Sequence, residues 1–148
     1  MFHAQRGGNL RPLGRRGCQD WSYRHNNWTL RPGIAEVLDL ATGHGIPLAV
    51  VSYTLCGTAH RDFLAKTGVG KLFAAQIYSD EAGVRKPNPQ MIWNATDELA
   101  VPPDRCWFVG DSRRRDIVCA RRADAAAAIL MVSPAPPRKP PPTGPHPT

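Results

Sequence analysis

The chain has 148 residues and a formal net charge of +7, a length that suits one compact domain with its own hydrophobic core. The charge belongs to the two ends: residues 1–31 sum to +5, residues 133–148 sum to +2, and the eleven basic and eleven acidic residues of 32–132 cancel. This distribution argues against nucleic acid as a partner, and the lack of an apolar run of about 18 residues argues against a membrane span.

The four cysteines have irregular spacings, and none of them forms a CxxC pair. Scattered cysteines are typical of reduced thiols, and the five histidines do not accompany them in the pattern of a zinc site. The first 30 residues also lack the apolar segment of a secretory signal. We therefore expect a cytoplasmic protein without zinc. The cysteines are Cys18, Cys56, Cys106 and Cys119.

Composition divides the chain into three segments. Residues 1–31 are rich in Gly and Arg with little apolar periodicity, which predicts a poorly ordered segment. Residues 133–148 contain eight prolines, which predicts a disordered tail with polyproline II character. That tail is either a solvated end or a ligand for an SH3-type partner, because APPRKPPP resembles a PxxP site with basic neighbours. Residues 32–132 are the expected folded domain.

Within 32–132, helical and strand periodicities alternate along the chain. The first helix starts at Pro32 and ends at Gly43, with Ile34, Val37 and Leu38 on one apolar face. The alternation predicts an α/β fold with a mostly parallel sheet and helices on both faces. The later elements are expected at 47–52 (strand), 58–67 (helix), 75–79 (strand), 89–100 (helix), 106–109 (strand), 112–122 (helix) and 126–132 (strand, although its alanine run could also be helical).

Polar residues follow three of the expected strands, where parallel sheets carry their chemistry. Ser52 ends one strand, Lys86 lies in the loop after the next, and Asp111 follows the third, with Asp116 five residues later. A phosphoryl-transfer site needs a cation, hydrogen-bond donors and carboxylates for Mg²⁺, and these residues supply each of them. Singly, each residue could also be a cap, a solvated loop charge or a surface ion pair. Their order and spacing together favour the site.

Three stretches of sequence, LRPGIAEVLDLATGHGIPLAVVS, GVRKPNP and CWFVGDSRRRDIVCARRAD, resemble the haloacid dehalogenase superfamily, in particular its phosphatase branch. The resemblance implies a Rossmann-like three-layer α/β/α fold. It implies that Ser52 and Lys86 are catalytic, that Ser52, Tyr53 and Lys86 bind phosphate, and that Asp111 and Asp116 hold Mg²⁺. The expected substrate is a small phosphorylated metabolite, hydrolysed through an aspartyl-phosphate.

The sequence departs from that superfamily at its first motif, DxDx[TV], whose first Asp is the nucleophile. No DxD occurs in the chain, Asp20 follows no apolar strand, and HNNWTL at 25–30 lacks both carboxylates. In the superfamily the first-motif strand lies between the strands that here end at Ser52 and Gly110, so we expect an incomplete sheet with its central strand missing. The alternative function is a catalytically inactive fragment or an interaction module that uses the Pro-rich tail.

Two further departures lie near the expected site. Tyr53 stands where relatives often have Asn, which predicts a reshaped phosphate-binding loop. Three consecutive arginines, Arg113 to Arg115, follow Asp111. They either raise the affinity for phosphate or form a solvated helix face, and the sequence alone leaves both interpretations open.

Overall fold

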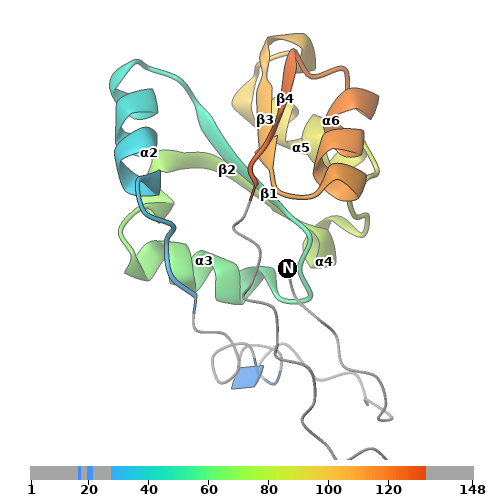
Figure 1. Cartoon of the computed structure of the whole chain (residues 1–148). Coiled ribbons are helices and arrows are strands. Elements are labelled where there is room, and N and C mark those ends of the chain that lie inside the picture. Colours follow the sequence, from blue (N-terminus) through green and yellow to red (C-terminus); the bar gives the residue numbers. More distant parts are fainter. Residues whose placement is uncertain (1–16, 18–19, 22–27, 133–148) are drawn as a thin grey trace, which may run out of the picture.

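The computed structural model describes residues 17, 20–21 and 28–132 (Figure 1). The remaining residues up to 27 and the Pro-rich tail lie outside the described residues, and so do the expectations for them. None of the helices in the described part has the length and hydrophobicity that a membrane span needs. The helices and strands, in chain order, are α2 (Ile34–Gly43), β1 (Leu48–Ser52), α3 (Gly57–Lys66), β2 (Phe73–Tyr78), α4 (Ser79–Ala82), α5 (Gln90–Leu99), β3 (Trp107–Gly110), α6 (Val118–Arg122) and β4 (Ala127–Leu130).

The order of strands and helices follows the sequence-based expectation, with two differences. Strand β2 starts two residues earlier than predicted, and at Ser79 the chain enters the short helix α4, whose first turn holds Asp80 and Glu81. Acidic side chains at a helix N-terminus are favourable, whereas the four residues of α4 are too few to show a helical period. The expected helix at 112–122 is divided into a π-helical turn, Arg113–Ile117, and α6.

The strands form two separate parallel pairs rather than one sheet. β1 pairs with β2, with Ser52 opposite Tyr78 at their carboxyl ends. β3 pairs with β4, with Gly110 opposite Leu130. No strand pairing among the described residues joins β1 to β3. The fold is therefore α/β as predicted, and its sheet is interrupted where the central strand was expected to be missing.

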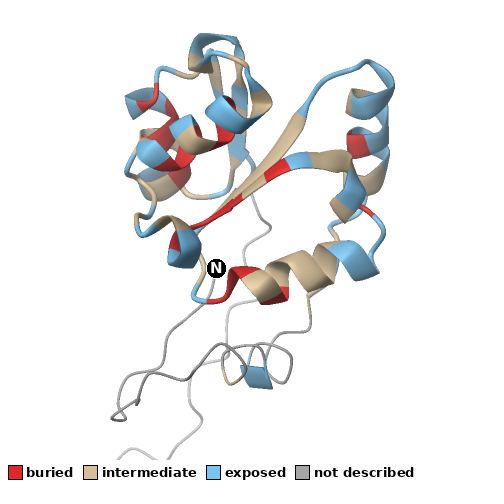
Figure 2. Cartoon of the chain, turned by 180° about the vertical axis from the view of Figure 1, so that it is seen from behind, coloured by how far each residue is buried: buried red, intermediate tan, exposed pale blue. Residues whose placement is uncertain are grey.

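Helices α5 and α6 hold the two strand pairs together through one shared hydrophobic core. α5 packs on both β1 and β2, and α6 lies beside β4. α2 and α3 lie on the other side of the β1–β2 pair (Figure 1). Buried residues lie where α5 and α6 face the strands, and also at the end of β2 and the start of α3 (Figure 2). The core cluster consists of Ile77, Met91, Ile92, Ala95, Cys119, Ala120 and Ala123, with Ala49, Val51 and Phe108 packed against it.

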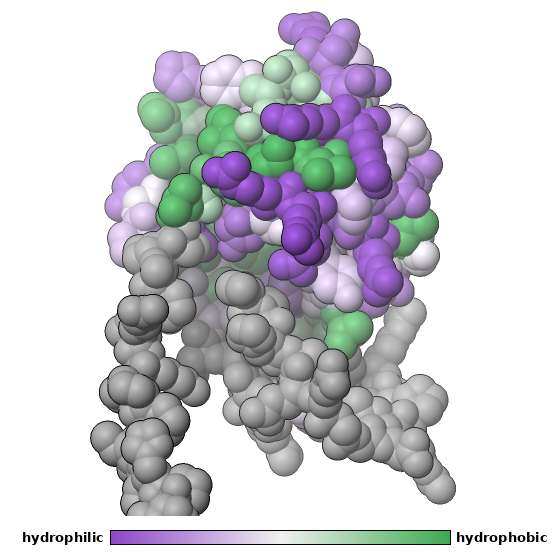
Figure 3. All heavy atoms as spheres, turned by 45° about the vertical axis from the view of Figure 1, so that its right-hand side comes forward, coloured by the Kyte–Doolittle hydropathy of each residue, from purple (hydrophilic) through white to green (hydrophobic). Residues whose placement is uncertain are grey.

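The face of β3 that points away from this core is open. Phe108 packs against the core, whereas its neighbours Trp107 and Val109 are 73% and 52% exposed. Val37, predicted to share the buried face of α2, is 60% exposed, while Leu38 is buried. The half of the molecule that holds α6 also shows hydrophobic surface between long hydrophilic side chains (Figure 3). Large apolar residues thus remain uncovered beside the interrupted sheet.

The shared core gives a direct test of the packing. Met91 is fully buried between the two halves, so replacing it with alanine should lower the free energy of unfolding by about 2–5 kcal/mol through lost contacts and a residual cavity. The exposed Val37→Ala change is the control and should alter that free energy by less than about 0.5 kcal/mol. Urea unfolding followed by circular dichroism measures both. Similar small effects for the two variants would contradict a shared core.

Candidate functional site

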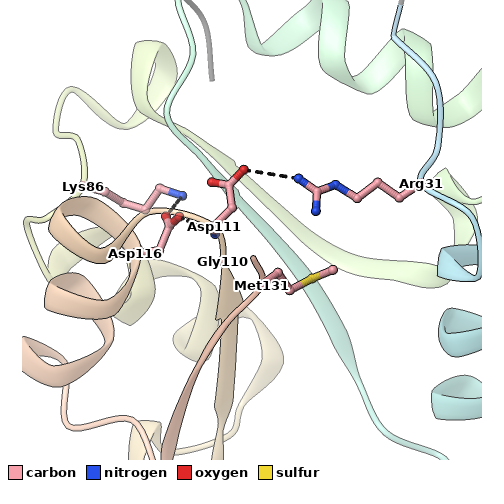
Figure 4. A pocket seen from close by; sticks show the side chains of 6 residues that line it. All are labelled: Arg31, Lys86, Gly110, Asp111, Asp116 and Met131. Atoms are coloured by element: carbon pink, nitrogen blue, oxygen red, sulfur yellow. Dashed lines mark hydrogen bonds and ion pairs between the residues drawn. The ribbon is translucent and has the colours of Figure 1, made fainter. Parts of the chain in front are cut away.

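The loops after β2 and β3 bring together residues that are far apart in the sequence. Lys86, Asp111 and Asp116 line one pocket of about 260 Å³ (Figure 4). Arg31, Gly110 and Met131 complete its lining. Ser52 and Tyr53 follow the same edge of the strands, but they are not among the residues that line this pocket.

Lys86 links the two strand pairs. Its ammonium group donates a hydrogen bond to the carbonyl oxygen of Val51 in β1, at 3.0 Å. The same nitrogen lies 2.6 Å from Oδ1 of Asp116, in the segment after β3. The Lys86 side chain is only 11% exposed, so this charge is largely shielded from solvent and needs its partners. One ammonium group therefore spans the interruption between β1 and β3.

Asp116 is the buried partner in this pair, with a side chain that is 6% exposed. Its Oδ2 accepts hydrogen bonds from the backbone N–H groups of Asp111 at 3.0 Å and Ser112 at 2.9 Å. Burial by itself raises the pKa of the Asp116 carboxyl. The hydrogen bond and charge of Lys86, together with the two N–H groups, outweigh burial and bring that pKa below its usual value. Asp116 is therefore a carboxylate at neutral pH, fixed in place by three groups.

Asp111 has a different environment, although it lies only five residues away. Its side chain is 44% exposed, and Oδ2 lies 3.5 Å from the guanidinium of Arg31. Figure 4 shows the Asp111 carboxylate directed toward Arg31, while Asp116 is directed toward Lys86. Sequence reasoning missed Arg31, because it belongs to the segment predicted to be poorly ordered. No motif marks it, and only the fold brings it to the pocket.

These contacts decide how well the two carboxylates suit a cation. Oδ1 of Asp116 is buried against Lys86, and Oδ2 already accepts two hydrogen bonds. In the described part of the chain, no group of three or more His, Cys, Asp or Glu side chains is arranged to hold a metal ion. The arrangement fits a cation at Asp111, with its exposed carboxylate, and does not fit one held jointly by Asp111 and Asp116.

Gly110 permits this packing because it has no side chain. A Cβ atom at this position would collide with the Cβ and carboxyl group of Asp116. The turn from β3 into the Asp111 loop therefore requires glycine on grounds of space.

Comparison with known proteins agrees with the geometry. The sequence profile described as "Haloacid dehalogenase-like hydrolase" matches residues 15–130. The chain belongs to this family. It is 30% identical over 129 residues to haloacid dehalogenase-like hydrolase domain-containing protein 3 of Xenopus laevis, a match that covers 87% of this chain and 51% of that protein. It is 28% identical over 101 residues to the phosphoglycolate phosphatase of Escherichia coli strain K12, covering 68% and 39%.

Among solved structures, this haloacid dehalogenase-like chain is similar to CbbY from Rhodobacter sphaeroides in complex with xylulose-(1,5)bisphosphate. The TM-score is 0.70 with 25% sequence identity, and the match covers 87% of this chain and 60% of that one. The chain spans about half the length, or less, of the two curated relatives named above. The family match therefore covers most of this chain but corresponds to only part of the length of those relatives.

Gly110→Ala tests the close packing around Asp116. The added methyl group must displace the Asp116 carboxylate, so we expect a loss of about 1–3 kcal/mol in the free energy of unfolding. Large shifts of the Asp111 and Ser112 amide signals in NMR spectra should accompany it. Gly43→Ala is the matched control, because nothing lies within 4 Å of a Cβ at that position. If both variants left stability and those two signals unchanged, the packing described for Asp116 would be wrong.

Proposed function

We propose that the site binds the phosphate group of a small phosphomonoester beside Lys86 and belongs to a Mg²⁺-dependent phosphatase that works through an aspartyl-phosphate. The observation that supports this most strongly is the Lys86 ammonium, held at the carboxyl ends of the strands. An ammonium group has three donors, and the contacts with Val51 and Asp116 leave one for a phosphate oxygen. Phosphatase relatives with small phosphorylated substrates in their names agree with this choice of ligand.

In this proposal, residues of both strand pairs have distinct roles. Lys86 balances the charge of the phosphate, and the Ser52 hydroxyl and the Tyr53 loop supply further donors at the end of β1. Asp116 acts as a positioning residue, because it fixes Lys86 and the backbone N–H groups of the Asp111 loop. The side chain closest to the phosphate is thereby held in place before any ligand binds.

Mg²⁺ is the expected cofactor, and Asp111 is the residue whose carboxylate fits it directly. The ion would neutralise phosphate charge when bound. It must compete with Arg31 for the Asp111 carboxylate, and few protein ligands surround it. Mg²⁺ bound through few carboxylates keeps most of its waters, so we expect weak affinity, on the order of millimolar. The predicted participation of Asp116 would require its contact with Lys86 to change.

Turnover needs a carboxylate aimed in line at phosphorus, and the residues of the pocket do not offer one. Asp116 is held by Lys86 and two N–H groups, and Asp111 is directed toward Arg31. The sequence also contains no DxD motif. We therefore expect this chain to bind phosphate without hydrolysing esters at a rate typical of the family.

An assay with p-nitrophenyl phosphate and Mg²⁺ tests this expectation. The chain should be inactive, and a variant extended upstream by an apolar strand that ends in DxDGT should gain activity, which Lys86→Ala then abolishes. In parallel, Mg²⁺ titration followed by NMR should shift signals near Asp111, and Asp111→Asn should remove those shifts. Activity in the unextended chain that is lost in both Lys86→Ala and Asp111→Asn would reveal a nucleophile among its own residues, with Asp20 the first to examine.

A second candidate function is an interaction module without catalysis. The open face of β3, with Trp107 and Val109 exposed, favours it, because unpaired strand edges and uncovered apolar residues attract partners. The Pro-rich tail, the other element of this hypothesis, lies outside the described residues. Inactivity of the strand-extended variant as well would favour this function.

A further inference from the structure

Two arginines converge on the ring of Tyr53, directly after β1. The guanidinium carbon of Arg115 lies 5.6 Å from the ring centroid, and that of Arg85 lies 5.9 Å from it. The three residues come from the segments that follow β1, β2 and β3, with Arg115 in the π-helical turn, so they share the strand edge that carries Lys86 and Asp111. Tyr53 thus gathers two positive charges at the same end of the molecule as the pocket.

Among the described residues, a third arginine also lies over a tyrosine ring, and it differs from Arg85 and Arg115 in having an acidic partner. Arg61 lies 4.6 Å from the ring centroid of Tyr78 and also forms a two-pronged ion pair with Glu81, at 2.6 and 2.8 Å. For Arg85 and Arg115, no carboxylate lies within ion-pair distance in the described part of the chain. Two guanidinium groups that lie at one ring without an acidic partner attract an anion.

Position along the chain ties this pair to the phosphate site. Arg85 directly precedes Lys86, and Arg115 directly precedes Asp116. The Cα atom of each arginine therefore lies about 3.8 Å from the Cα atom of one member of the buried ion pair. The Ser112 hydroxyl accepts a hydrogen bond from Nε of Arg115 at 3.4 Å, which leaves the two terminal nitrogens of that guanidinium for a ligand. Arg85 and Arg115 thus flank the Lys86–Asp116 pair along the chain, although neither arginine lines the pocket itself.

We propose that Arg85 and Arg115, held on the ring of Tyr53, bind a second anionic group of the substrate whose phosphate lies at Lys86. The proposal rests on the proposed function and narrows it to phosphomonoesters that also carry a carboxylate or a second phosphate. The three consecutive arginines then have different roles. Arg115 belongs to the site, whereas Arg113 and Arg114 are exposed side chains of a solvated helix face.

The test compares, on the full chain, two phosphate esters with the same two-carbon chain. Ethyl phosphate carries only the phosphate, and phosphoglycolate carries a carboxylate at the other end. Isothermal titration calorimetry should show phosphoglycolate binding about tenfold more tightly. Arg85→Gln and Arg115→Gln should each reduce this preference and leave the affinity for ethyl phosphate unchanged. A bisphosphate of a three-carbon diol tells whether a second phosphate serves as well as a carboxylate.

Three control variants separate a ligand site from a structural role. Tyr53→Phe keeps the ring and should keep the preference, whereas Tyr53→Leu should lose it. Arg121→Gln removes an exposed charge from α6 and should leave the preference intact, which excludes a general effect of net charge. NMR spectra of each variant verify that the fold is retained.

The outcomes distinguish this proposal from the function on which it rests. Equal affinity for the two ligands, or a preference that survives in both arginine variants, would overturn the second-anion site and leave the phosphate site standing. Failure of the chain to bind ethyl phosphate, or binding that Lys86→Ala leaves unchanged, would overturn the proposed function itself. Loss of preference in Arg121→Gln equal to that in Arg115→Gln would also overturn the site, because net charge would then explain the effect.

Discussion

The arrangement of this protein depends on one buried ammonium group. Lys86 contacts the carboxyl end of β1 through the Val51 carbonyl and the segment after β3 through Asp116. No strand pairing in the described residues connects these two places. The charges of Lys86 and Asp116 are both largely shielded, so neither residue can lose its partner without leaving an uncompensated charge, at a cost of about 3–5 kcal/mol. The same contact that joins the halves also presents the ammonium to the pocket.

The interrupted sheet explains both what the site contains and what it lacks. Helices α5 and α6 join the halves on one face through the core around Met91 and Cys119. The strand ends thus still converge, and Lys86 meets Asp116 although the two residues are far apart in the sequence. Between β1 and β3, however, no strand among the described residues carries a carboxylate toward the pocket. In the proposed function, Lys86 therefore supplies the group that binds phosphate, whereas the described strands supply no carboxylate to attack it.

The sequence predicted much of this fold because its signals are local. Apolar runs bounded by glycine and proline predict β1 and β3, and helical periodicity over 89–100 predicts α5. Placing Lys86 and Asp111 after parallel strands also predicts that they meet at one edge, as the pocket shows. These inferences need only the period of the strands and helices and the direction of parallel chains.

The features that sequence reasoning missed depend on contacts between distant residues. Asp111 and Asp116 look alike in the sequence, yet one is directed to Arg31 and the other to Lys86. No local pattern distinguishes them, because their partners come from other parts of the chain. The collision that a side chain at Gly110 would cause, and the convergence of Arg85 and Arg115 on Tyr53, are visible only once the loops are placed in space.

A double-mutant cycle on Lys86 and Asp116 tests the central claim most directly. Unfolding free energies would be measured for Lys86→Met, Asp116→Asn and the double variant. We expect each single change to cost about 3–5 kcal/mol, because it leaves one buried charge alone, and the double change to cost little more than one of them. If the two single effects instead added up to within about 0.5 kcal/mol of the double effect, the two residues would be independent, and the Lys86–Asp116 contact would not link β1 to the segment after β3.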